Sequence, residues 1–132
     1  MKSILIIGLG RFGRHLCRKF MSLKNEVMIV DRDEAAVTAL ADEATSAQIA
    51  DCTDENALRA LGVKNFDLCF VCIGSDFASS LLITSMLKDM GAARVVAKAS
   101  QDIHAKLLLR NGADEVVYPE RDSAERMATR MS

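Results

Sequence analysis

The sequence predicts an α/β domain with a doubly wound, six-stranded parallel sheet and helices on both faces. Short apolar segments alternate with amphipathic helical patterns along the whole chain. The apolar segments are continuous rather than alternating in polarity, which is typical of strands that helices cover on both faces. Strand–helix–strand units connect with right-handed crossovers, so we expect one sheet with the strand order 3-2-1-4-5-6.

Each element follows from a local pattern. Apolar segments, the third of them weaker than the others, predict strands at 4–7, 27–30, 48–50, 68–73, 95–97 and 116–118. Apolar residues that recur every three or four positions predict helices at 12–23, 34–43, 55–61, 77–90, 103–110 and 123–131. Gly62 directly follows the helix 55–61, and Asn111-Gly112 follows the helix 103–110, where glycine tolerates the left-handed conformation of a helix end.

The composition is that of a globular protein of one domain, with 132 residues, 50% of them hydrophobic and 27% charged. The net charge of −1 argues against nucleic acid or an anionic membrane surface as a partner. No apolar segment approaches the roughly 20 residues of a membrane span, and none has the form of a secretory signal. We therefore expect a cytoplasmic protein that is not inserted in a membrane and whose four cysteines are reduced.

Residues 8–13 read Gly-Leu-Gly-Arg-Phe-Gly and lie between the first predicted strand and the first predicted helix. In this context the G-x-G-x-x-G pattern indicates a dinucleotide-binding turn, so the predicted sheet is of Rossmann type. Gly8 permits the tight turn, Gly10 lets a pyrophosphate approach the backbone, and Gly13 lets the helix pack closely on the sheet. Free N–H groups at the start of the helix then bind phosphate oxygens.

Two charged residues extend this prediction. Asp31 ends the second strand, 18 residues after Gly13, where a carboxylate accepts hydrogen bonds from ribose hydroxyls and repels the 2′-phosphate of NADP. Arg11 lies inside the fingerprint, and it either contacts the phosphates of the ligand or is a solvated side chain at a helix start. The predicted ligand is NAD(H) or an adenosine nucleotide (ATP, ADP or AMP), and both classes fit these residues.

The chain also resembles the amino-terminal nucleotide-binding subdomain of RCK (KTN) domains, which are cytosolic regulators of potassium channels and of Trk- and Ktr-type potassium uptake. The matching segments are distributed over the whole chain: 6–13, 30–31, 51–54, 61–62, 73–74, 112–114 and 118–120. The last segment, Tyr-Pro-Glu, has no counterpart in the generic dinucleotide fingerprint, which makes the resemblance specific.

The resemblance implies roles at the matched positions. The implied phosphate contacts are Gly8, Gly10, Arg11 and Gly13. The implied contacts to the first ribose and to the adenine edge are Asp31, Asp51 and Cys52, and those to the far ribose or phosphate are Gly74 and Ser75. Ile73 is a further candidate contact without an assigned role. Glu120 is expected near a terminal phosphate and a divalent cation. The remaining candidate contacts are Phe12, Arg32 and Lys98, the last of which fits either a phosphate contact or a surface lysine.

Two features depart from the RCK pattern. The residue before Asp51 is often glycine in that family, whereas this chain has Ala50, which alters the expected adenine pocket. Full RCK domains continue into a second ligand-binding lobe, so we expect residues 1–132 to be the amino-terminal domain of a longer chain, or else a protein whose last helix packs against a partner. The apolar side of the predicted helix 77–90 is wider than one sheet contact requires, which predicts a homodimer or a larger ring.

The remaining reactive side chains give weaker signals. Cys69 and Cys72 have C-x-x-C spacing, but alternation along a strand places them on opposite faces, so we expect buried thiols rather than a dithiol or metal site. His15 falls on the polar side of the first helix, and His104 opens a later helix. With only two histidines and no accompanying carboxylate pattern, the sequence predicts no protein-built metal site.

Two function classes fit the predicted fold. A regulator would bind nucleotide and pass its occupancy to a membrane potassium channel or transporter, at the inner face of the membrane. An NAD-dependent oxidoreductase would also need a substrate pocket and usually a general acid or base, whereas the cofactor fold uses nearly the whole chain. We therefore expect a regulator and no enzyme, with the oxidoreductase as the alternative and a scaffold that binds no nucleotide as a third possibility.

Overall fold

The computed structural model describes residues 1–132 and contains the predicted six-stranded parallel sheet, in the order β3-β2-β1-β4-β5-β6. Its elements are β1 (Ser3–Ile7), α1 (Arg11–Ser22), β2 (Glu26–Asp31), α2 (Glu34–Leu40), the 3-10 helix η1 (Ala41–Glu43), β3 (Ser46–Ile49), α3 (Glu55–Ala60), the 3-10 helix η2 (Val63–Asn65), β4 (Leu68–Val71), α4 (Phe77–Asp89), β5 (Val95–Lys98), α5 (Asp102–Arg110), β6 (Glu115–Val117) and α6 (Pro119–Met131).

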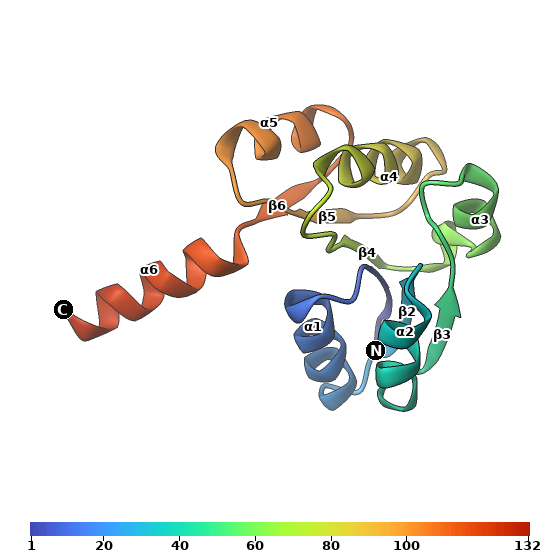
Figure 1. Ribbon diagram of the computed structural model, residues 1–132, viewed down its shortest axis with the longest axis horizontal. Helices are drawn as coiled ribbons and strands as arrows, with labels where there is room; N and C mark the ends of the chain where they lie inside the picture. Colours follow the sequence, from blue (N-terminus) through green and yellow to red (C-terminus); the bar gives the residue numbers. More distant parts are fainter.

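Helices cover both faces of the sheet, as Figure 1 shows. On one face α1 and α2 contribute Cys17 and Val37 to a core cluster with the strands. On the other face α3, α4 and α5 contribute Leu58, Ile83 and Leu108 to a second and larger cluster. The continuous apolar strands are buried on both sides, which is the reason that their sequence shows no alternation.

The parallel register brings the carboxyl ends of the strands to one edge. Ile7 at the end of β1 pairs with Val30 of β2 on one side and with Val71 of β4 on the other. From β1 the chain turns first toward β2 and later crosses over to β4, so the loops after β1 and β4 diverge at this point. An open α/β sheet forms its ligand crevice at such a switch point.

Several predicted boundaries were wrong by a few residues. The third strand lies at Ser46–Ile49 and not at 48–50, and the fourth ends at Val71, two residues early. The largest error concerns α6, which begins at Pro119 rather than at residue 123. Proline fits the first turn of a helix because its missing N–H has no partner there, and Asp122 accepts a hydrogen bond from the Tyr118 N–H at 3.3 Å.

The final helix projects from the body of the domain (Figure 1). All residues from 123 to 132 are exposed, including Met127 and Met131, which are 50% and 74% exposed. By contrast, the apolar side of α4 is occupied by the core, and only Leu82 remains exposed on it. Leu81, Met86 and Met90 are partly buried against the same core, and the homodimer or larger ring that the width of this apolar side predicts stays a prediction. No helix has the length and apolar character needed to cross a membrane.

Candidate functional site

The glycine-rich turn after β1 is held by contacts that leave no room for side chains at two of its three glycines. Gly8 has a φ of +99°, and a Cβ there would lie 2.9 Å from the carbonyl of Cys72. A Cβ on Gly13 would lie 2.1 Å from the carbonyl oxygen of Gly8. The first turn of α1 is thereby packed directly against the end of β1, as the fingerprint predicts.

Gly10 differs from the other two glycines because a Cβ on it would meet no atom within 4 Å. Its φ of −72° is open to any residue. Gly10 lies at the start of α1, where no side chain caps the helix and the first turn has no acidic residue. The free N–H groups of this turn border the open space beside Gly10, which is the arrangement that binds anions at a helix start.

Asp31 is oriented by two backbone donors. Its Oδ2 accepts a hydrogen bond from the Leu9 N–H at 2.8 Å, and its Oδ1 accepts one from the Asp33 N–H at 2.9 Å. The first bond ties the carboxylate directly to the glycine-rich turn. Each oxygen keeps a lone pair for a further donor, so the carboxylate can accept from sugar hydroxyls beside a phosphate held at the turn.

The loop after β3 supplies a second ordered carboxylate. Asp51 accepts hydrogen bonds from the N–H and the hydroxyl of Thr53, at 3.0 and 2.6 Å. These bonds and the nearby positive charge of Arg32 lower the pKa of Asp51. Cys52 is 4% exposed, and its burial, with the charges of Asp51 and Asp31, raises its thiol pKa to about 11. The thiol is therefore neutral, and Cys52 can make polar contacts with a ligand only through its backbone.

The opposite wall of the crevice comes from the loop between β4 and α4. Asp76 caps α4 and accepts hydrogen bonds from the N–H and hydroxyl of Ser79, at 3.2 and 2.6 Å. Those bonds, assisted by the charge of Arg32, lower the pKa of Asp76. The Nζ atom of Lys98 lies 3.1 Å from the position of a Cβ on Gly74. An ammonium group thus lies over the loop at residues 73–75.

These loops enclose a cleft of about 390 Å³ at the carboxyl edge of the sheet. The predicted residues that line it are Gly8, Gly10, Asp31, Arg32, Asp51, Cys52, Ile73, Gly74 and Ser75. They come from four different loops between residues 8 and 75, so the fold brings together most of what the sequence placed at one site. The cleft volume falls in the range of small-molecule sites.

Comparison with known proteins assigns this chain to a family. Residues 4–119 match the TrkA-N domain. The chain belongs to the TrkA-N family. Ktr system potassium uptake protein C of Bacillus subtilis is 44% identical to it over 127 residues, covering 96% of this chain and 58% of that protein. Ktr system potassium uptake protein A of the same organism is 39% identical over 131 residues, covering 99% and 59%.

The resemblance to regulators of potassium transport is thereby confirmed at the level of the family, and the chain spans less than two thirds of the length of these relatives. Two solved structures share the fold. The GsuK channel bound to NAD superposes with a TM-score of 0.78 at 20% identity, covering 88% of this chain and 21% of that one. The AMP-bound Kef carboxyl-terminal domain of Shewanella denitrificans gives 0.78 at 24%, covering 95% and 76%.

Five predicted contacts of this TrkA-N domain do not line the cleft. Gly13 is buried beneath the turn, and the Phe12 side chain packs on the core. Arg11 is exposed at the start of α1 and forms no ion pair, and the Nζ atom of Lys98 lies close to Gly74 without lining the cleft. Glu120 is exposed on the first turn of α6, after the edge strand β6 and away from the cleft. Their contacts with a ligand remain predictions.

Eight other residues line the cleft that were not among the predicted ligand contacts, although Ala50 was expected to alter the adenine pocket. They are Ile7, Leu9, Ala50, Thr53, Cys72, Asp76, Ser79 and Ile83. Asp76 carried a readable signal, because an aspartate directly before a helical pattern is a typical helix cap. Ile83 carried none, since an apolar residue in the middle of α4 reads only as core. The structure gathers no three His, Cys, Asp or Glu side chains that could hold a metal ion.

Proposed function

We propose that this TrkA-N domain binds an adenine nucleotide in the cleft and regulates potassium uptake through its occupancy. The observation that carries the proposal is the bare backbone at Gly10, which is open for 4 Å and lies beside the uncapped start of α1 and the oriented carboxylate of Asp31. A diphosphate fits the bare backbone at Gly10 and the helix start beside it, and a ribose fits the carboxylate of Asp31. A cleft for a neutral metabolite would have no need of both.

The charges of the cleft also favour a ligand with its phosphates at Gly10 and its ribose at Asp31. Three of the side chains that line the cleft are carboxylates, from Asp31, Asp51 and Asp76, and they accompany the single cation of Arg32. Hydroxyl and amino groups of adenosine can donate to such acceptors, whereas a 2′-phosphate would be repelled. The phosphates then point toward the start of α1, where Arg11 is unpaired. NAD and AMP in the two structural neighbours support nucleotide as the ligand class.

The regulatory part of the proposal rests on the relatives. The two Ktr system potassium uptake proteins of Bacillus subtilis share 39% and 44% identity with this chain and are longer than it. We infer that residues 1–132 act as the amino-terminal, nucleotide-sensing domain of such a protein, on the cytoplasmic side of a membrane potassium transport subunit. The domain is a sensor and not an enzyme in this proposal, and it works as a homodimer or a larger ring.

Titration calorimetry with ATP, ADP, AMP, NAD⁺ and NADH tests the proposal, with NADP⁺ as the matched control for NAD⁺. We expect saturable binding of at least one adenine nucleotide, and NADP⁺ to bind about tenfold more weakly than NAD⁺ because its extra phosphate meets Asp31. Arg11→Ala should reduce any preference between ATP and ADP. Absence of binding heat and of a thermal shift with all five compounds would contradict the proposal.

A further inference from the structure

The charges of this domain are separated along the sequence. Residues 1–24, which include β1 and α1, contain six Lys or Arg residues and no Asp or Glu. Residues 31–55, from the end of β2 to the start of α3, contain eight Asp or Glu residues and one Arg. The net charge of −1 averages these two regions. The expectation that it excludes an anionic partner therefore applies to the domain as a whole and not to each of its faces.

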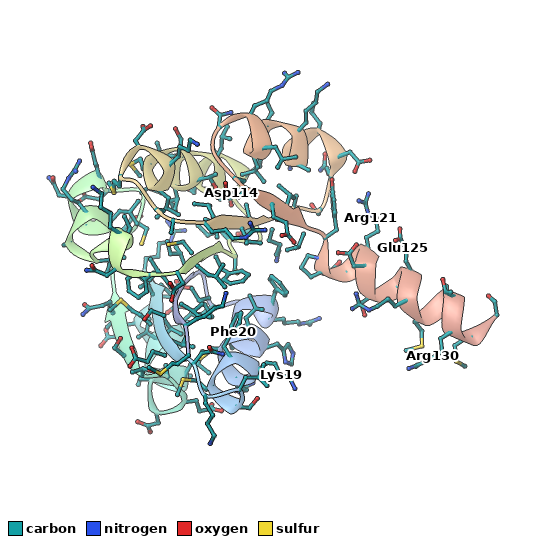
Figure 2. All side chains as sticks on the ribbon, turned by 180° about the vertical axis from the view of Figure 1, so that it is seen from behind. Lys19, Phe20, Asp114, Arg121, Glu125 and Arg130 are labelled. Carbon is teal, nitrogen blue, oxygen red and sulfur yellow. The ribbon has the colours of Figure 1, made fainter.

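The positive charges gather on the outer side of α1. Five basic residues recur at intervals of three or four positions and therefore share one face of the helix. They are Arg11, Arg14, His15, Arg18 and Lys19, and all are exposed. We call these five residues the basic face of α1. On the inner side, the ring of Phe20 packs on the ring of Phe70, with centroids 5.6 Å apart. Figure 2 shows Phe20 on the side of α1 that faces the rest of the domain and Lys19 on the outer side.

Contacts within the domain do not account for the basic face. Only Arg18 is in an ion pair, in which its Nε donates to Oε1 of Glu43 at 3.0 Å. Arg11 and Arg14 are among the first four residues of α1, where no acidic residue accompanies them. Positive charge at this end opposes the helix dipole. The stability of the helix therefore gives no reason for placing arginine there.

We propose that the basic face of α1 binds the anionic surface of a phospholipid bilayer. A cluster of Lys and Arg on one helix face binds anionic headgroups, and each such residue near the surface strengthens binding about fivefold. Leu23, which is 58% exposed, follows Lys19 by four residues and adds an apolar side chain at the end of the face. An apolar residue beside cations fits the boundary between headgroups and acyl chains, whereas the phosphate backbone of a nucleic acid has no use for it.

The location of the domain comes from the proposed function, and this proposal rests on it for the location alone. The cytoplasmic loops of membrane proteins carry an excess of Lys and Arg, so a transport subunit would repel the basic face. The lipids of the cytoplasmic leaflet carry a negative surface potential, which attracts it. The acidic residues 31–55 lie to one side of α1, with α2 and β3 (Figure 1), so the separated charges turn α1 toward the bilayer and this edge away from it.

Co-sedimentation with phospholipid vesicles tests the proposal without nucleotide or a transport subunit. Vesicles of phosphatidylcholine alone are compared with vesicles of phosphatidylcholine and phosphatidylglycerol in equal parts. We expect the protein to bind only the mixed vesicles. Binding should weaken as the NaCl concentration rises, because salt screens the charge of the headgroups. Failure to bind the mixed vesicles at low salt would overturn the proposal.

Two pairs of substitutions separate the basic face from the net charge. Arg14→Gln combined with Lys19→Gln removes two charges that lie outside the nucleotide cleft, and it should weaken binding to mixed vesicles about 25-fold. Lys106→Gln combined with Arg110→Gln removes the same charge from exposed positions of α5, on the other face of the sheet. This control should bind within about twofold of the parent protein. Thermal unfolding confirms that both variants are folded, and equal weakening by both pairs would overturn the proposal.

The same variants distinguish other partners of the basic face. Light scattering without vesicles reports association between copies of the chain, and duplex DNA of mixed sequence is the nucleic acid probe. Self-association that Arg14→Gln with Lys19→Gln abolishes, in a protein that binds no vesicles, would assign the face to a second copy and refute the lipid contact. Tighter binding to DNA than to mixed vesicles would refute it as well. Because no nucleotide is present, failure here leaves the proposed nucleotide binding intact, and failure of the calorimetric test leaves the vesicle result standing.

Discussion

The glycine-rich turn and α6 are the most and the least constrained parts of this domain. At the turn, backbone packs on backbone so closely that a single Cβ on Gly13 would lie 2.1 Å from the Gly8 carbonyl oxygen. Along α6, every residue from 123 to 132 is exposed, and only the first turn contacts the rest of the domain. Packing within the domain therefore fixes the glycine-rich turn, whereas it leaves residues 123–132 of α6 exposed.

This difference suits a sensor. A site that recognises phosphate through backbone N–H groups has to be rigid, because the groups must already point at the ligand when it arrives. An output element has to be poised between orientations, because a ligand shifts an equilibrium only by its differential affinity for the two states. In the proposed function, the glycine-rich turn between β1 and α1, at the switch point of the sheet, meets the first requirement.

The largest effect is expected at Gly13. Gly13→Ala should destabilise the domain by on the order of 3 kcal/mol, because the new methyl group forces α1 away from β1. Gly10→Ala is the matched control in the same turn, since its Cβ meets no protein atom and its φ of −72° suits alanine. Gly10→Ala should change stability by less than about 0.5 kcal/mol and weaken nucleotide binding about tenfold.

Urea unfolding and calorimetry of both variants measure these effects. If Gly13→Ala were as stable as the parent protein, the claim that close packing fixes the glycine-rich turn would be wrong. If Gly10→Ala bound nucleotide as tightly as the parent protein, the ligand would not approach the backbone at that residue, and the phosphate position proposed above would have to be abandoned.

Asp31→Ala should have the next largest effect. It leaves the Leu9 and Asp33 N–H groups without their acceptor, and the loss of hydrogen bonds to a charged group costs about 2 kcal/mol. Binding of every adenine nucleotide should weaken as well, since all of them share the ribose. Asp33→Ala removes only the cap of α2 and is the control. Equal nucleotide affinity in Asp31→Ala and the parent protein would contradict the assigned role of Asp31.

The two regions also differ in how far the sequence predicted them. The glycine-rich turn was predicted residue by residue, because the steric demand at Gly8 and Gly13 acts within the turn and admits only glycine. Asp31 was predicted for a related reason, since the strand register fixes the distance from the end of β2 to the turn. Local constraints of this kind are readable from residue type and spacing alone.

The base of α6 was predicted poorly. Its start was placed four residues late, because Tyr118 continued the apolar pattern of β6 and Pro119 was read as part of a motif rather than as a helix start. The contacts of Asp102 with Tyr118 and Arg121 join residues 16 and 19 positions apart. They depend on how α5 and α6 meet at the edge of the sheet, and no pattern within either helix specifies that packing.

Thr84, in the buried part of α4, provides a test with a smaller expected effect on stability. Its hydroxyl is fully buried in α4 and has no hydrogen-bond partner. Thr84→Val replaces it with a methyl group of nearly the same size, so the variant should be more stable by about 1 kcal/mol. Thr84→Ala, which also removes the hydroxyl but leaves a void, should not gain stability. Thermal unfolding of both variants decides, and destabilisation by valine would show that the hydroxyl has a partner.

The smallest effect on the folded domain is expected in α6. Met127→Ala and Met131→Ala alter side chains that are 50% and 74% exposed and that contact no core residue, so each should change the free energy of unfolding by less than about 0.5 kcal/mol. If these apolar side chains instead pack on another subunit, the same substitutions should weaken self-association, which light scattering across a range of protein concentrations measures. Loss of stability in a strictly monomeric protein would mean that α6 packs against its own domain, and the contrast with the glycine-rich turn would fail.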